Sequence, residues 1–274
     1  MINRDIDRRR FFGVSVAAVS SIALSNPLIP YDNSMRKQKN TIETGDDAQG
    51  ILELDLYTHK LEEQGHFYAN LLNLPVKRLN KDTIQVLAGA TKLRFRRAEK
   101  DQGAPAYHFA FNIPENKIYQ VRDWLLKRTK TLKQNGREIF DFRHWDAHAV
   151  YFHDPAGNVA ELIAHHKLKN ATSGPFTERE IIGACEIALV VDDVPKTVSD
   201  IYHKLEMNTL DSIPAMESFA AVGTRHRMLI IMKRGRRMLS SDVYAQPFAV
   251  TAHLSGETQR AYPFENYPFV VTLG

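Results

Sequence analysis

One arrangement of secondary structure recurs along the chain and limits what it can fold into. A strand is followed by a helix and then by two or more strands, and this unit starts near residues 52, 107 and 185. In the first unit, leucines alternate with polar residues over 52–57, which predicts a half-buried strand. A helix over 61–72 and a hairpin over 83–95 follow. The recurrence predicts an α+β protein built from paired βαβββ modules.

The later units set the expected domain boundaries. Their predicted elements are strands 107–113, 147–153, 159–164 and 185–190, helix 194–205, hairpin 218–233 and strands 248–252 and 269–273. The first two units would form one complete domain, 51–167, and the remainder a second, incomplete domain, 178–274. The segment between them is rich in Asn, Ser, Gly and Pro, which is typical of a linker.

The N-terminal residues resemble a targeting segment and are not expected to belong to the fold. Paired arginines precede Phe11 and Phe12, and a mildly apolar run follows over 13–24, the layout of a signal peptide over 1–26. The arginine pair resembles the bacterial twin-arginine type, which implies export to the periplasm. The alternative is an uncleaved N-terminal anchor, although the run is short for a membrane span. Residues 27–50 are polar and read as a linker.

Charge and cysteine content exclude some functions. The formal net charge is only +4 in 274 residues, and no basic stripe with interleaved aromatic residues suggests nucleic acid binding. The basic run Arg234–Arg237 is expected to be a solvated hairpin. Cys185 is the single cysteine, so neither an internal disulfide nor a thiolate metal cage can form. It is expected to be a small buried core residue.

The second unit contains the most specific motif. Residues 150–162 read Val-Tyr-Phe-His-Asp-Pro-Ala-Gly-Asn-Val-Ala-Glu-Leu, a strand, a tight turn and a second strand. This motif, together with the paired units, resembles the vicinal oxygen chelate superfamily, which includes glyoxalase I, extradiol dioxygenases and fosfomycin and bleomycin resistance proteins. The resemblance implies a sheet curled into a cup that holds a divalent metal ion.

The resemblance also implies which residues bind the metal. In this superfamily the ligands come from the first and last strands of each unit, which points to Glu53, His108 and Glu161. A fourth ligand would fall in Leu93-Arg94-Phe95, where no carboxylate is present. Alternation along each strand agrees, because Glu53, Asp55 and Tyr57 share one face, and Glu161 lies among apolar neighbours where an unpaired carboxylate is costly.

The expected function follows from this ligand set. With one histidine and two carboxylates, the site suits Mn, Fe or Zn with open positions, acting on a small oxygen-rich substrate. Asp55, Tyr57 and Tyr151 are expected to contact the substrate, and His148 to transfer protons, with His144 and Trp145 in the loop just before it. The alternatives are an extradiol-like ring-cleaving dioxygenase and a non-catalytic small-molecule-binding protein. An incomplete second domain leaves sheet edges that a homodimer could cover.

Overall fold

The computed structural model describes residues 50–101 and 103–274. The predicted signal peptide and the linker that follows it lie outside the described residues. In the described ranges, no helix combines the length and the apolar character needed to cross a membrane.

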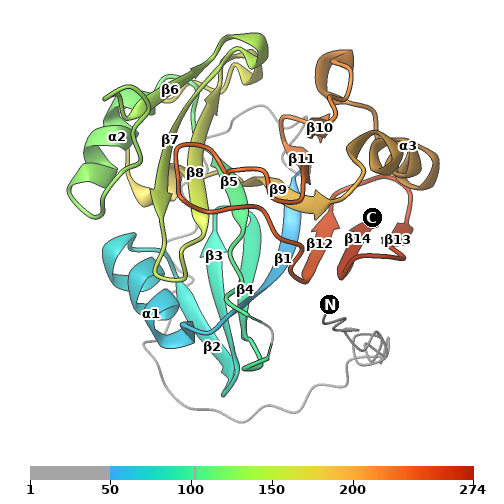
Figure 1. Cartoon of the computed structure of the whole chain (residues 1–274). Coiled ribbons are helices and arrows are strands. Elements are labelled where there is room, and N and C mark those ends of the chain that lie inside the picture. Colours follow the sequence, from blue (N-terminus) through green and yellow to red (C-terminus); the bar gives the residue numbers. More distant parts are fainter. Residues whose placement is uncertain (1–49, 102) are drawn as a thin grey trace. The chain divides into compact units, whose positions relative to one another are not determined.

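Four units of similar construction follow one another along the chain (Figure 1). The first unit contains β1 (Ile51–Thr58), α1 (Leu61–His66) with a π-helical turn (Phe67–Leu71), β2 (Val76–Asn80), β3 (Thr83–Ala88) and β4 (Thr91–Arg97). The second contains β5 (His108–Asn112), α2 (Ile118–Leu126), β6 (Ile139–Phe142), β7 (Ala147–His153) and β8 (Val159–His165). The third contains β9 (Gly183–Val191), α3 (Val194–Leu205), β10 (Phe219–Thr224) and β11 (Arg227–Lys233). The fourth contains β12 (Val250–Leu254), β13 (Arg260–Pro263) and β14 (Phe269–Leu273).

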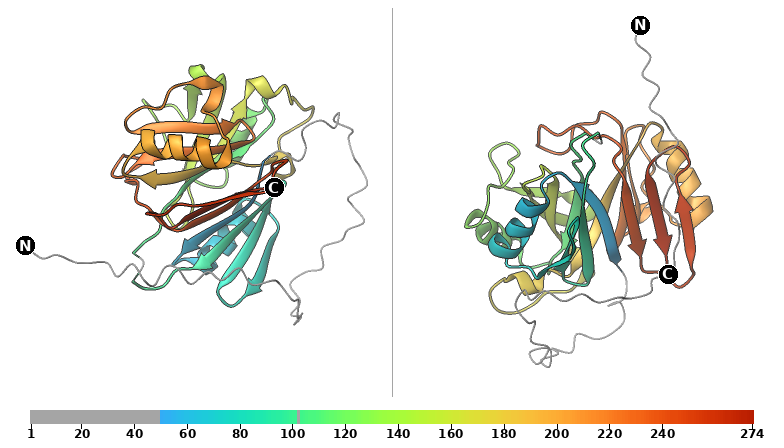
Figure 2. Two further views of the ribbon diagram at one scale, coloured as in Figure 1. Left: turned by 90° about the vertical axis from the view of Figure 1, so that its right-hand side faces the viewer. Right: turned by 90° about the horizontal axis from the view of Figure 1, so that it is seen from below.

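The units pair differently from the sequence-based expectation. The first strand of the second unit, β5, pairs antiparallel with β9 of the third unit. The first strand of the first unit, β1, pairs antiparallel with β12 of the fourth unit, which lies beside it in the view from below (Figure 2). Units 2 and 3 therefore form one half of the protein, called here the inner pair. Units 1 and 4 form the other half, called the outer pair. The expectation that units 1 and 2 curl into one cup is wrong.

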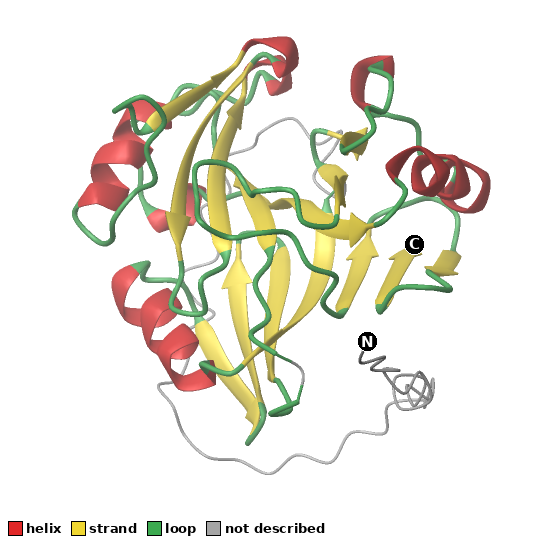
Figure 3. Ribbon diagram, viewed as in Figure 1, coloured by secondary structure: helices red, strands yellow, loops and turns green. Residues whose placement is uncertain are grey.

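One mixed sheet connects the two halves. Its path runs β13-β14-β12-β1-β9-β5-β8-β7-β6, and β1 meets β9 through Ile51 and Ala184. The helices lie on the outer side of this sheet (Figure 3), where α2 contacts β7 and β8 and α3 contacts β11. The two sides of the sheet carry separate apolar clusters, one including Phe109, Leu162 and Val121 under the helices, the other including Ala110, Tyr151 and Ile163 on the concave side of the inner pair.

The Asp-Pro-x-Gly-Asn turn joins unit 1 to unit 2. The Asp154 carboxylate accepts hydrogen bonds from the Gln64 amide and the Tyr68 hydroxyl of the first unit, and from the backbone of its own turn. Asn158 accepts a hydrogen bond from the backbone N–H of Tyr107. Gly157 has a φ of +84°, which glycine adopts without strain. The motif is therefore structural, and it fixes the start of β5 at the residue before His108.

Candidate metal centre

His108 is the first residue of β5 and points into the concave side of the inner pair. Its Nδ1 lies 2.9 Å from the carbonyl oxygen of Val159 on the neighbouring strand β8. A carbonyl oxygen can only accept a hydrogen bond, so Nδ1 carries the proton. In the tautomer that carries its proton on Nδ1 alone, Nε2 is left free to act as a metal ligand. This is the usual support for a metal-binding histidine.

Two carboxylates converge on that nitrogen. Nε2 of His108 lies 3.5 Å from Oε2 of Glu161 and 3.6 Å from Oε2 of Glu186. Glu161 comes from β8 and Glu186 from β9, the strands on either side of β5. One ligand atom from each of the three residues lies within 4.8 Å of the other two. The three side chains form a compact group in which each could bind the same ion.

The two carboxylates are deeply buried and poorly paired. Glu161 and Glu186 are each 1% exposed, and within the described ranges both oxygens of Glu161 and Oε1 of Glu186 lack a hydrogen-bond partner. Burial, followed by repulsion from Glu186, raises the pKa of Glu161 well above its usual value, although the nearby Tyr151 hydroxyl acts in the opposite direction. Unpaired buried carboxylates cost several kcal/mol in folding free energy, and a divalent cation between them would remove that cost. The residues therefore fit a metal ion.

Strand register shows why the group has three members. Glu161 faces Ala110, two residues beyond His108 on β5. On the other side of the pair, Ile230 of β11 faces Ala188, two residues beyond Glu186 on β9. Ile230 thus occupies the position that matches Glu161, and its side chain cannot bind a metal. With three protein ligands, coordination positions would remain open for water or substrate.

A cavity of about 480 Å³ opens onto this group, with His108, Glu186 and Tyr151 in its wall. That volume is typical of small-molecule sites. The other lining residues come from β6 and the β6–β7 loop, from β10 and the segment before it, from β11, and from the loop after β11. They are Asp141, Phe142, Arg143, His144, Trp145, Met216, Phe219, Ile230, Met232, Arg236, Arg237, Met238 and Leu239. Most of them are apolar or aromatic, which would keep water away from a substrate bound there.

Tyr151 supplies a hydroxyl at the cavity wall. Burial, together with the charges of Glu161 and Glu186, raises the pKa of Tyr151 well above its usual value. The hydroxyl is therefore protonated at neutral pH and can donate a hydrogen bond. Tyr151 thus lines the cavity, and its contact with a substrate stays a prediction.

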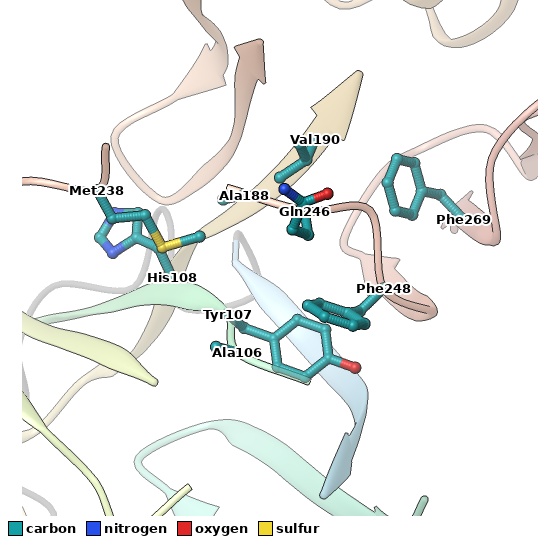
Figure 4. Close-up of a pocket in the computed structure, with 9 residues that line it drawn as sticks. All are labelled: Ala106, Tyr107, His108, Ala188, Val190, Met238, Gln246, Phe248 and Phe269. Atoms are coloured by element: carbon teal, nitrogen blue, oxygen red, sulfur yellow. The ribbon is translucent and has the colours of Figure 1, made fainter. Parts of the chain in front are cut away.

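The loop 234–249 between β11 and β12 closes one side of the site. Met238 of this loop and His108 line one crevice, together with Gln246 and Phe248 from the same loop (Figure 4). Backbone hydrogen bonds between Arg236 and Ala245, and between Met238 and Val243, hold the loop as a hairpin. The loop thus forms an ordered wall over the start of β5.

Glu53 and Asp55 lie elsewhere. Glu53 forms salt bridges with Lys92 at 3.0 Å and with Arg94 at 2.8 Å. Asp55 forms salt bridges with Arg94 and Arg96. These side chains belong to the outer pair and do not join His108 and Glu161. Glu186 takes the place that the sequence-based prediction gave to Glu53, because β5 pairs with β9 and not with β1.

Tyr57 and His148 also lie outside the cavity. Tyr57 follows Asp55 on β1, in the outer pair, and its backbone N–H donates to the hydroxyl of Tyr107. On β7, His148 shares a side with Val150, opposite to Tyr151, and its ring nitrogen lies 2.7 Å from that of His166. The geometry therefore gives His148 no contact with the candidate metal centre. The nearby His144 lines the cavity instead.

Cys185 precedes Glu186 at an irregularity in the β5–β9 register. Its thiol is buried, and burial raises its pKa well above the usual value, as expected for a core residue. Cys185, His165 and Glu186 form a second group of ligand-type atoms within 4.8 Å of one another. Burial lowers the pKa of His165 to about 3, so this ring is neutral.

Sequence reasoning missed Glu186, although a signal for it was present. Glu53 precedes Tyr68 by fifteen positions, and Glu186 precedes Tyr202 by sixteen, so the two glutamates lie in the equivalent first strands of their units. Nothing in this spacing says which two units share a cup. Only the observed pairing of β5 with β9 selects Glu186.

Comparisons with known proteins support the fold. No family model matches the sequence, and no curated protein matches it. Among solved structures, a proposed dioxygenase from Bacillus subtilis is 14% identical, with a TM-score of 0.50 over 82% of this chain and 84% of that chain. A glyoxalase I mutant from Zea mays is 12% identical, with a TM-score of 0.50 over 82% of this chain and 93% of that chain. The chain has the fold of the glyoxalase/bleomycin resistance/dioxygenase proteins, as predicted from its repeated units and its Asp-Pro-Ala-Gly-Asn motif.

Proposed function

We propose that the protein is a metal-dependent enzyme that binds a small substrate through two adjacent oxygen atoms. The observation that carries the proposal is the convergence of His108, Glu161 and Glu186, with two poorly paired buried carboxylates, beside a cavity that His108 and Glu186 line. When bound, a divalent ion of Mn, Fe or Zn would hold the two substrate oxygens and stabilise negative charge that develops on them.

The protein residues have distinct roles in this proposal. Val159 fixes the orientation of the His108 ring, and the two glutamates supply the negative charge that retains a divalent ion. The hydroxyl of Tyr151 donates a hydrogen bond to a substrate oxygen, because it stays protonated beside the carboxylates. The loop 234–249 excludes bulk water, which strengthens each of these polar interactions.

Binding of matched probes to Mn²⁺-loaded protein tests the proposal. Catechol has two adjacent oxygens, whereas resorcinol has the same ring and the same number of hydroxyls but not adjacent ones. We expect catechol, and not resorcinol, to change the Mn²⁺ electron paramagnetic resonance spectrum. Glu186→Ala should abolish the change and Glu53→Ala should preserve it. A spectrum that catechol leaves unaltered would reject the proposal.

A ring-cleaving dioxygenase is the second candidate. The aromatic side chains of Phe142, Trp145 and Phe219 in the cavity wall favour it, since they suit a flat ring. Oxygen uptake by the Fe²⁺-loaded protein with a panel of catechols separates the two candidates. Uptake with ring cleavage would support the dioxygenase. Chelation without uptake would leave a lyase, an isomerase or a binding protein, which substrate turnover would then distinguish.

A further inference from the structure

The wall of the cavity beside the candidate metal centre combines flat rings with a cationic group. Phe142 and Trp145 are stacked with ring centres 5.8 Å apart, and Trp145 and Phe219 are stacked at 6.3 Å. These three side chains are partly exposed, so their ring faces are not all covered by protein. A row of stacked rings with free area is suited to hold another flat ring.

Three arginines line the same cavity, and they differ in their partners. Arg143 forms a salt bridge with Asp141 at 2.9 Å, and Arg237 forms one with Asp242 at 2.8 Å. Within the described ranges Arg236 has no carboxylate at salt-bridge distance, and one of its nitrogens donates to the hydroxyl of Ser218. Among the three arginines of the cavity wall, Arg236 is therefore the one whose charge no carboxylate of residues 50–101 and 103–274 neutralises.

Arg236 is held in place by a ring of the same wall. Its guanidinium carbon lies 5.2 Å from the centre of the Phe219 ring, so the two groups form a cation–π contact. A guanidinium has five N–H donors, and the bond to Ser218 uses one of them. The remaining donors can bind a carboxylate, and the packing on Phe219 orients the guanidinium for it.

We infer that the substrate is an aromatic compound that carries two adjacent oxygens at one end and an anionic group at the other. The adjacent oxygens would bind at His108, Glu161 and Glu186, the ring would lie against Trp145, and the anion would reach Arg236. This inference rests on the proposed function, since the metal centre fixes one end of the substrate. Arg236 belongs to the basic run Arg234–Arg237, for which the sequence predicted only a solvated hairpin, and the inference gives this residue a role in substrate binding.

Two probes that differ only in charge test the anionic part. The 3-(2,3-dihydroxyphenyl)propanoate ion and its amide have the same ring, oxygens and side-chain length. We expect calorimetric titration of the Mn²⁺-loaded protein without oxygen to give about tenfold tighter binding of the carboxylate. Arg236→Gln should remove this preference. Arg234→Gln should keep it, because Arg234 pairs with Asp192 and does not line the cavity.

The outcomes separate the inference from the proposed function. Equal binding of both probes by the wild type, or an unchanged preference in Arg236→Gln, would overturn the inference while the proposed function stands. If neither probe binds, the proposed function and the inference both fail. For the aromatic part, Trp145→Leu should weaken both probes by a similar factor of about five. The same variant should leave glycolate binding unchanged, and an equal loss for glycolate would count against ring stacking.

Discussion

The two halves of the sheet place different chemistry at equivalent positions. In the inner pair, His108 begins β5, Glu161 faces the residue two beyond it, and Glu186 lies across the antiparallel junction. In the outer pair, the matching positions hold Glu53, Arg94 and Thr251. One half therefore carries three potential metal ligands, and the other carries one carboxylate, one arginine and one threonine.

The difference lies in how each half balances its negative charge. In the outer pair, the Arg94 guanidinium lies 2.8 Å from Glu53 and 3.3 Å from Asp55, and with Lys92 it holds the pKa of Glu53 below its usual value, although burial acts in the opposite direction. In the inner pair, no lysine or arginine of the described residues lies at salt-bridge distance from Glu161 or Glu186, and the pKa of Glu161 is raised. In the outer pair, the Arg94 guanidinium permanently neutralises the carboxylates of Glu53 and Asp55. In the inner pair, a metal ion could neutralise Glu161 and Glu186 instead.

The largest expected effect is on metal affinity in the inner pair. His108→Ala removes a ligand, so we expect the dissociation constant for Mn²⁺ to rise at least about 100-fold, or about 3 kcal/mol. Calorimetric titration measures the change. His148→Ala is the matched control, because it lies on the other side of the sheet and should change the constant less than about twofold. Equal losses in both variants would contradict the proposed site.

The pH dependence of metal binding should also distinguish the halves. Because the pKa of Glu161 is raised, this carboxyl holds a proton at pH values where an ordinary glutamate is ionised, and the metal must displace that proton. Mn²⁺ affinity should therefore rise with pH from the ordinary glutamate range up to the raised pKa, by at most about tenfold per pH unit. Titrations in two buffers of different ionisation enthalpy would count the released proton.

The raised pKa of Glu161 also predicts how the free energy of unfolding of the metal-free protein depends on pH. A carboxyl with a raised pKa binds its proton more tightly in the folded state than in the unfolded state. The free energy of unfolding of the metal-free protein should therefore fall as pH rises through that window, by up to about 1.4 kcal/mol per pH unit. Glu161→Gln should flatten this slope and prevent metal binding. A slope that persists in Glu161→Gln would assign it to another group.

A smaller effect is expected in the outer pair. Arg94→Ala leaves Glu53 paired with Lys92 and Asp55 paired with Arg96, so the free energy of unfolding should fall by only about 1 kcal/mol. Urea denaturation measures this loss. Mn²⁺ affinity should stay unchanged, since Arg94 belongs to the half without the metal centre. A large loss of metal binding would indicate that the two halves are coupled.

Local signals in the sequence predicted the elements well but not their pairing. Helix 194–205 and strands 147–153 and 269–273 have the predicted bounds, because alternation and helical periodicity depend on neighbouring residues. Strand β2, with mostly exposed residues, and the short strand β13 gave no such pattern and were missed. His108 and Glu161 were identified from one unit, whereas Glu186 depends on which distant strand joins β5.

The turn Asp154–Asn158 also shows that local structure could be predicted from the sequence, whereas contacts with distant residues could not. Its residues predicted a tight turn, and the structure confirms one. Its hydrogen bonds to Gln64 and Tyr68 could not be predicted, because they join units that do not share a cup. Export by a twin-arginine signal and assembly as a homodimer both stay predictions.

Metal content of two glutamate variants tests the central claim most directly. Wild-type protein, Glu53→Ala and Glu186→Ala are to be loaded with Mn²⁺, freed of excess ion by gel filtration and analysed for bound metal. We expect about one equivalent in the wild type and in Glu53→Ala, and almost none in Glu186→Ala, with all three proteins folded by circular dichroism. Metal retained by Glu186→Ala and lost from Glu53→Ala would contradict the assignment of the metal centre to the inner pair.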